Sequence, residues 1–143
     1  MEKSKKMNIV NESRIKGFYL WKGSFFLLSG LIGLLHLVIL GLEMFASKEK
    51  QAKTFDMPYE FVTQANAQIA LKNMGIYNGC LGLAMLTSLL LFQGEVRLMV
   101  LLLFNLFVVI VGVYGGKTVT KTIYLIQALP GTVTALLILF QSI

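Results

Sequence analysis

The sequence predicts an all-α membrane protein, an up-and-down bundle of four transmembrane helices. Of its 143 residues, 56% are hydrophobic and only 14% are charged, and the mean hydropathy is +0.73. A water-soluble domain of this size is far more polar. The apolar residues fall into four runs, at about 23–45, 73–92, 98–114 and 120–140. Each is close to the roughly 20 helical residues that cross a hydrocarbon core of about 30 Å.

Two regions precede and interrupt these spans. Residues 1–17 are polar and basic, which predicts a loosely ordered N-terminal tail before a transmembrane domain at 18–143. The loop at 47–66 separates the first two spans, and Pro58 predicts a short helix starting near Tyr59. We expect the loop's aromatic residues to lie on the membrane surface, with capping of the bundle as the alternative. The other links are short, so neighbouring helices should be antiparallel.

The net charge of +6 comes largely from lysine and arginine placed before the first span. Such basic flanks favour anionic lipid and the cytoplasm rather than nucleic acid. The side that holds both termini and the second turn carries seven Lys or Arg, against six in the first and third loops. We therefore expect a multi-pass protein of the cell membrane with cytoplasmic termini, in contact with membrane lipids and with no nucleic-acid partner.

A polar stripe runs along the first span. Lys22, Ser29, His36 and Glu43 are spaced by seven residues, which is nearly two whole helical turns, so they share one face. Because ionisable groups facing lipid are costly, this face should point into the bundle. His36 and Glu43 lie about 10 Å apart along the axis, so other groups or a ligand can come between them.

Polar residues of the other spans should gather at the depth of His36 and Glu43. Alternate spans run in opposite directions, which brings the end of one beside the start of the next. The residues placed in this half of the membrane are Asn73, Tyr77 and Asn78 of the second span, Tyr114 of the third, and Tyr124 and Gln127 of the fourth. The opposite half is almost wholly apolar. A set of donors and acceptors at one depth indicates a ligand pocket or a polar lock between helices.

Each of these residues also has a structural interpretation. His36 can be satisfied by a facing Asn or Tyr, Glu43 can pair with Lys72 or Lys117, and Asn73 and Tyr77 can serve as interhelical hydrogen bonds. One histidine and one carboxylate two turns apart do not make a metal site, and the single cysteine supports neither a disulfide nor a thiolate site within one chain. We expect no metal and no cofactor.

Proline, glycine and one further asparagine add packing features. Pro130 cannot donate to the carbonyl of Ile126, so it predicts a helix kink beside Gln127. Asn105 should belong to a separate helix contact. Two pairs of glycines, Gly75 with Gly79 and Gly112 with Gly116, should allow close helix approach. They also permit a homodimer.

Four segments together resemble the family of small membrane proteins called domain of unknown function 1304. They are HLVILGLEMF from His36, NMGIYNGCLG from Asn73, GVYGGKT from Gly112 and QALPG from Gln127. The resemblance covers roughly residues 23–140. It implies a compact four-helix membrane protein with signature residues His36, Glu43, Asn73, Tyr77, Asn78, Tyr114, Gln127 and Pro130, and it implies no established activity. The lysine-rich tail departs from the family's shorter starts.

Three functions are compatible with these patterns. The leading hypothesis is a non-catalytic protein that binds or transports a small amphiphile or lipid-like molecule, because a pocket polar at one end and apolar at the other matches such a molecule. The principal alternative is a membrane isomerase or similar enzyme that uses His36 and Glu43 for acid-base chemistry. The third is a small proton-coupled exporter with the same two residues as relay. No catalytic residue is assigned.

Overall fold

The computed structural model describes the backbone of residues 2–141 and the side chains of residues 23–141. Its elements, in chain order, are α1 (Glu2–Phe45), α2 (Lys48–Thr54), α3 (Tyr59–Val62), α4 (Ala65–Leu91), α5 (Gly94–Thr118), the π-helical segment η1 (Tyr124–Ala128) and α6 (Leu129–Gln141). Within these residues there is no strand. Helices satisfy every backbone hydrogen bond internally, which is what a hydrocarbon solvent requires.

Four of the helical stretches are long and apolar enough to cross a membrane: Gly23–Phe45, Ala65–Leu91, Gly94–Thr118 and Tyr124–Gln141. Large apolar side chains cover their outer surfaces, as lipid-facing helices require. The prediction of an all-α bundle of four transmembrane helices is confirmed. The protein is a multi-pass membrane protein by its architecture.

Several boundaries differ from those expected. Helix α1 begins at Glu2, so the segment expected to be a loose tail continues the helix of the first span. That segment has no proline and its only glycine is Gly17, so elongating an existing helix meets no strong breaker. Helix α4 starts at Ala65, eight residues before the expected start of the apolar run, because a helix can extend beyond the hydrocarbon layer with polar residues.

The glycines after Tyr114 do not form a turn. Helix α5 continues through Gly115 and Gly116 to Thr118, because Gly116 serves helix packing: an added Cβ there would lie 2.7 Å from the ring of Tyr124. Gly112 likewise faces the backbone of Ala128, where an added Cβ would lie 2.8 Å from the amide nitrogen. The interpretation of Gly112 and Gly116 as a close-packing pair is confirmed.

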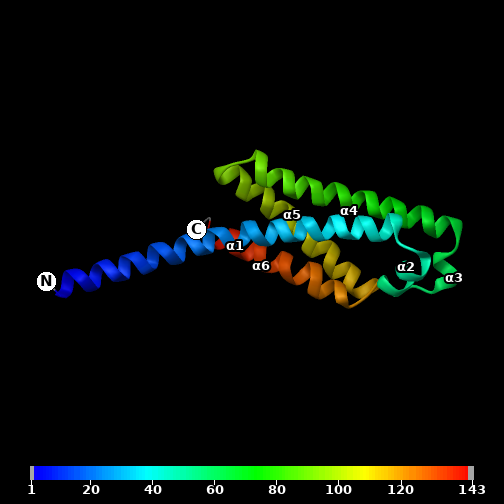
Figure 1. The fold of residues 1–143 in the computed structure, drawn as a ribbon, viewed down its shortest axis with the longest axis horizontal. Coiled ribbons are helices and arrows are strands. Elements are labelled where there is room, and N and C mark those ends of the chain that lie inside the picture. The colour runs from blue at the N-terminus through cyan, green and yellow to red at the C-terminus, as the bar shows by residue number, and fades with distance from the viewer. Residues whose placement is uncertain (1, 142–143) are drawn as a thin grey trace.

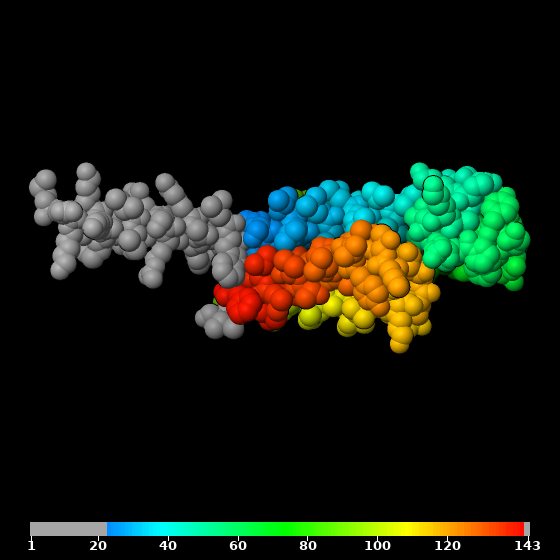
Figure 2. Space-filling model, turned by 90° about the horizontal axis from the view of Figure 1, so that it is seen from below, coloured from blue at the N-terminus to red at the C-terminus, as the bar shows by residue number. Residues whose placement is uncertain are grey.

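Helix α1 lies at the centre of the arrangement. It packs along α4 on one side and against α6 on another, while α5 pairs with η1 and α6 (Figures 1 and 2). The apolar core has two clusters. Phe25, Leu101 and Ile138 join α1, α5 and α6, and Ile32, Met85 and Val108 join α1, α4 and α5.

Glycines set the close approach of α1 and α4. A Cβ at Gly82 would lie 2.6 Å from the carbonyl oxygen of Gly33, and one at Gly79 would lie 2.8 Å from the side chain of Leu40. The first contact involves backbone, which cannot turn away as a flexible side chain can. Gly75 belongs to the same face, since its added Cβ would meet Met44 at 2.7 Å. The predicted pair Gly75 and Gly79 is thus a packing surface, extended by Gly82.

By contrast, α4 and α5 separate as they leave their connecting turn at Phe92 and Gln93 (Figure 1). They touch over much less of their length than α1 and α4 do. The polar residues after this link, from Gly94 to Arg97, form the first turn of α5. Gly94 has a φ of 56°, a backbone conformation that glycine adopts without strain.

The substitution Gly82→Ala should destabilise the protein by about 1–3 kcal/mol, because its methyl group forces α1 and α4 apart. The measurement is reversible unfolding in mixed micelles of dodecyl maltoside and SDS. Gly41→Ala is the matched control, since a Cβ at Gly41 meets nothing within 4 Å. Equal stability of the two variants would contradict the close packing at Gly82.

Candidate functional site: a groove between α4 and α5 beside Glu43

The carboxylate of Glu43 is buried in the last turns of α1, with 6% of the residue exposed. Gly75 of α4 allows this, because it leaves room for the Cβ of Glu43, which would lie 3.2 Å from a Cβ added to the glycine. One turn further along α4, the amide Nδ2 of Asn78 donates to Glu43 Oε2 at 2.8 Å. The structure therefore joins two of the predicted site residues, and the partner of Glu43 in this contact is an amide.

Asn78 uses the same nitrogen twice. Its Nδ2 also donates to the carbonyl oxygen of Met74 at 3.1 Å. A carbonyl oxygen can only accept, so the orientation of the amide group follows from the bond to Met74. Both Nδ2 hydrogens are then committed, and Oδ1 is left as the acceptor of this side chain.

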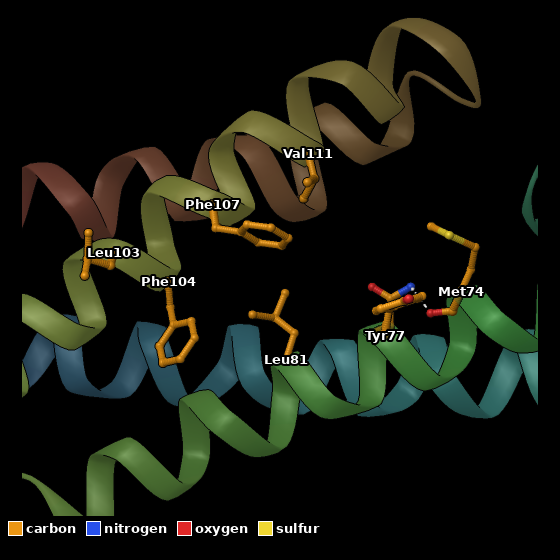
Figure 3. Close-up of a pocket in the computed structure, with 8 residues that line it drawn as sticks. Met74, Tyr77, Leu81, Leu103, Phe104, Phe107 and Val111 are labelled. Carbon is orange, nitrogen blue, oxygen red and sulfur yellow. Dashed lines mark hydrogen bonds between the residues drawn. The ribbon is translucent and has the colours of Figure 1, made fainter.

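A groove of about 420 Å³ opens where α4 and α5 separate. Phe104, Phe107 and Leu81 extend into it from the two helices, as Figure 3 shows. Tyr77 and Asn78 supply the polar lining, near Met74, while Leu103 and Phe104 lie at the other end. The full lining is Met74, Tyr77, Asn78, Leu81, Leu103, Phe104, Phe107 and Val111. The groove is thus apolar over most of its length and polar at one end.

His36 is fully buried but does not line this groove. Its Nδ1 donates to the carbonyl oxygen of Ile32 at 2.8 Å, one turn back in α1. Its Cβ faces Gly82, so the ring belongs to the close contact of α1 with α4. Within the part of the chain whose side chains are described, Nε2 is buried without a hydrogen-bond partner. Among the described side chains, His36 bonds to the Ile32 carbonyl and Glu43 to Asn78, and the two do not bond to each other.

The remaining predicted residues occupy three other places. Asn73 is exposed on α4, and Tyr114 is exposed on α5. Gln127 is half-buried in η1, where its Cβ faces Gly112 of α5. These residues lie on α4, α5 and η1, and the side chain of Glu43 bonds instead to Asn78. The polar cluster is consequently narrower than expected and centres on Glu43 and Asn78, with Tyr77 beside Asn78 in the groove.

Irregular backbone precedes Pro130. Over η1 the hydrogen bonds widen to the π-helical pattern, and the amide of Leu129 donates to the carbonyl of Tyr124. Pro130 has no amide hydrogen to donate to the Ile126 carbonyl. That α-helical hydrogen bond is therefore already missing, and a wider turn does not have to break it. Gly112 packs against this segment at Ala128. The irregular turn therefore lies in a helix contact between α5 and η1, away from the groove.

The stripe of polar residues on α1 continues to Ser29, which is also fully buried. Asn105 of α5 donates from Nδ2 to Ser29 Oγ at 3.1 Å and to the carbonyl of Leu101 at 2.8 Å. Asn105 thus makes the helix contact predicted for it, between α5 and α1 and away from Glu43. Its partner, Ser29, lies on the same face of α1 as His36. This bond ties α5 to α1.

Two residues that the sequence did not single out close the end of α1 nearest Glu43. Gln51 of α2 is almost fully buried, and its Nε2 donates to the backbone carbonyls of Glu43 at 2.8 Å and Leu42 at 3.3 Å. Gln68 of α4 donates to Gln51 Oε1 at 2.8 Å. Because a helix leaves its last carbonyls without partners, these side chains act as a cap. The loop therefore covers the end of α1 through Gln51, while its aromatic residues Tyr59 and Phe61 are exposed and their position on the membrane surface stays a prediction.

Outside the spans, Tyr59 donates to Glu49 Oε1 at 3.1 Å and links α3 to α2. The pKa of Glu49 lies below its ordinary value, first because its own backbone amide donates to it and then because Ser47 and Tyr59 do. The pKa of Tyr59 is raised, mainly because its hydroxyl is held by Glu49. Both residues are exposed and neither lines the groove, so this contact orders the loop without belonging to the groove.

The described side chains offer few candidate metal ligands at any one place. Within residues 23–141, no group of three or more His, Cys, Asp or Glu side chains gathers at one place. Cys80 is exposed on α4 and unpaired with any sulfur of the described residues.

The fold and the groove define a small membrane protein with four spans and an open side between two of them. The chain belongs to the family described as protein of unknown function DUF1304, whose match covers residues 30–139. It is similar to the uncharacterized protein YpaA of Lactococcus lactis subsp. lactis (strain IL1403), with 33% identity over 102 residues, which are 71% of this chain and 84% of the relative. No solved structure matches. The resemblance seen in the sequence is confirmed, and the type of membrane and the orientation of the termini stay predictions.

The substitution Asn78→Ala should lower the free energy of unfolding by about 1–2 kcal/mol, because it removes an interhelical hydrogen bond and leaves the Glu43 carboxylate without its amide partner. Asn73→Ala, on the same helix but exposed, is the control and should change the stability little. Unfolding in mixed micelles provides the comparison. An equal loss in both variants would argue against a specific bond between Asn78 and Glu43.

Proposed function

We propose that this protein binds a small amphiphile or lipid-like molecule in the groove between α4 and α5. The observation that carries the proposal is the division of the groove: Phe104, Phe107 and Leu103 supply apolar surface, while Tyr77 and Asn78 supply polar atoms at one end. A ligand with a polar head and an apolar tail matches this division. The volume of about 420 Å³ suits a molecule with one short chain rather than a whole two-chain lipid.

Access from the bilayer supports the same function. Leu103 and Phe107 are 67% and 51% exposed, so the groove is open along the side of the protein that faces lipid. A molecule dissolved in the membrane can enter laterally without crossing a barrier of polar residues. Transport would require in addition a second state that opens the groove elsewhere, and binding is the part of the hypothesis that the geometry of the groove supports.

Acid-base catalysis by His36 and Glu43 has less support. The ring of His36 lies in the contact between α1 and α4 and does not line the groove. A general acid or base must come within hydrogen-bond reach of the substrate. In this arrangement Glu43 is nearer to the groove, through Asn78, and it acts on a ligand by electrostatics.

The substitution Val111→Trp should weaken the binding of tritiated dodecanol about tenfold or more, because the indole fills part of the groove. The measurement is equilibrium binding to protein in phosphatidylcholine nanodiscs, with empty nanodiscs subtracted to remove partitioning into lipid. Val113→Trp is the matched control: it lies two residues away on α5, is exposed, and does not line the groove.

Retention of full binding in Val111→Trp, or an equal loss in both tryptophan variants, would contradict the proposed groove. So would an absence of saturable dodecanol binding to the unmodified protein. Native mass spectrometry of protein purified without added dodecanol gives a second readout. It should show a bound molecule that is depleted in Val111→Trp and retained in Val113→Trp.

A further inference from the structure

The electrostatic potential at the polar end of the groove depends on the charged groups near it. None of the eight lining residues is charged. Among the residues with described side chains, Glu43 is the one charged group that bonds to a member of the lining, through Asn78. Lys72 and Lys117, which could have neutralised this carboxylate, are exposed and do not line the groove. The field at the polar end is therefore negative when Glu43 is ionised.

The hydrogen-bonding groups at this end are mostly acceptors. Asn78 spends both Nδ2 hydrogens on Glu43 and Met74, so its Oδ1 is the atom left for a ligand. A donor bonded to a carboxylate becomes more polarised, which makes the carbonyl oxygen of the same amide a better acceptor. Tyr77 is 71% exposed and its hydroxyl can donate or accept. A head group that offers hydrogen atoms fits this end better than one that offers only lone pairs.

The low dielectric of the surroundings strengthens both the field of Glu43 and the hydrogen bond that Asn78 Oδ1 can accept. A carboxylate inside a membrane span is costly unless other groups compensate it, and Glu43 accepts a bond from one neutral amide. A positive head group beside Asn78 would supply the missing compensation, and a charge-assisted hydrogen bond is stronger than a neutral one. A negative head group would meet repulsion with no basic side chain in the lining to offset it.

We infer that the groove selects cationic amphiphiles, single-chain amines whose protonated head donates to Asn78 and is attracted by Glu43. This inference rests on the proposed function, because it names the class of molecule that the same groove takes. Uncharged alcohols with the same tail should bind more weakly, since they donate one bond without the charge. Anionic amphiphiles should bind least.

The test compares three tritiated ligands with one tail: dodecylamine, dodecanol and dodecyl sulfate. Binding is measured at neutral pH in phosphatidylcholine nanodiscs, with empty nanodiscs subtracted. The unmodified protein should bind the amine about tenfold more tightly than the alcohol, as one charge-assisted bond implies. The sulfate should bind more weakly than the alcohol.

Glu43→Gln is the decisive variant, because it keeps the shape and an acceptor oxygen for Asn78 while removing the charge. It should lose most of the preference for the amine and keep the affinity for dodecanol. Glu60→Gln, an exposed carboxylate in α3, is the control and should behave like the unmodified protein. A loss of folding would reduce all three affinities together, so the ratio of amine to alcohol binding separates electrostatic selection from a structural effect.

The outcomes distinguish the inference from the proposed function. Saturable binding of all three ligands with similar affinity would overturn the selection of cations while leaving the groove as a binding site. A preference for the amine that survives in Glu43→Gln would likewise overturn the role of Glu43. Failure of every ligand to bind would overturn the proposed function itself.

Discussion

The close contact between α1 and α4 is the constraint on which the other features depend. Glycines at positions 75, 79 and 82 remove the side chains that would hold these helices apart, and the backbone of Gly33 lies directly against Gly82. In a membrane, helices gain little from burying apolar surface, so close van der Waals contact and a few polar bonds decide the pairing. This pairing sets Glu43 beside Asn78 and buries His36 in the same interface.

The arrangement of α5 follows from where polar bonds are available. Asn105 binds Ser29 of α1, while Gly112 and Gly116 bring the later turns of α5 against η1. Those contacts draw α5 toward α1 and η1, so its later part leaves α4. The groove lies in the resulting space, and its polar end coincides with Asn78 because that residue already faces the α1 carboxylate. The contacts of α5 thus produce the opening, and the pairing of α1 with α4 produces its polarity.

Hydropathy and helical period made the spans and the polar stripe of α1 predictable, since both depend on local sequence. The up-and-down order of the spans was also predictable, because short links reverse the direction of the chain. The direction in which a side chain points around its helix was not: Asn73 and Tyr114 were expected in the cluster with Glu43 but are exposed. Gln51 was missed because its partners are backbone carbonyls of α1, reached only when the loop folds back. Gly115 and Gly116 have a turn's composition but serve packing, a difference that only a neighbouring helix reveals.

The most direct measurement of the central claim is an experimental structure of the protein extracted with native lipid, at a resolution that shows ordered amphiphiles. We predict elongated density between α4 and α5, with its tail against Phe104 and its head within hydrogen-bond reach of Asn78. A structure in which α5 closes onto α4 along its whole length, or in which Glu43 and Asn78 are apart and face lipid, would contradict the account.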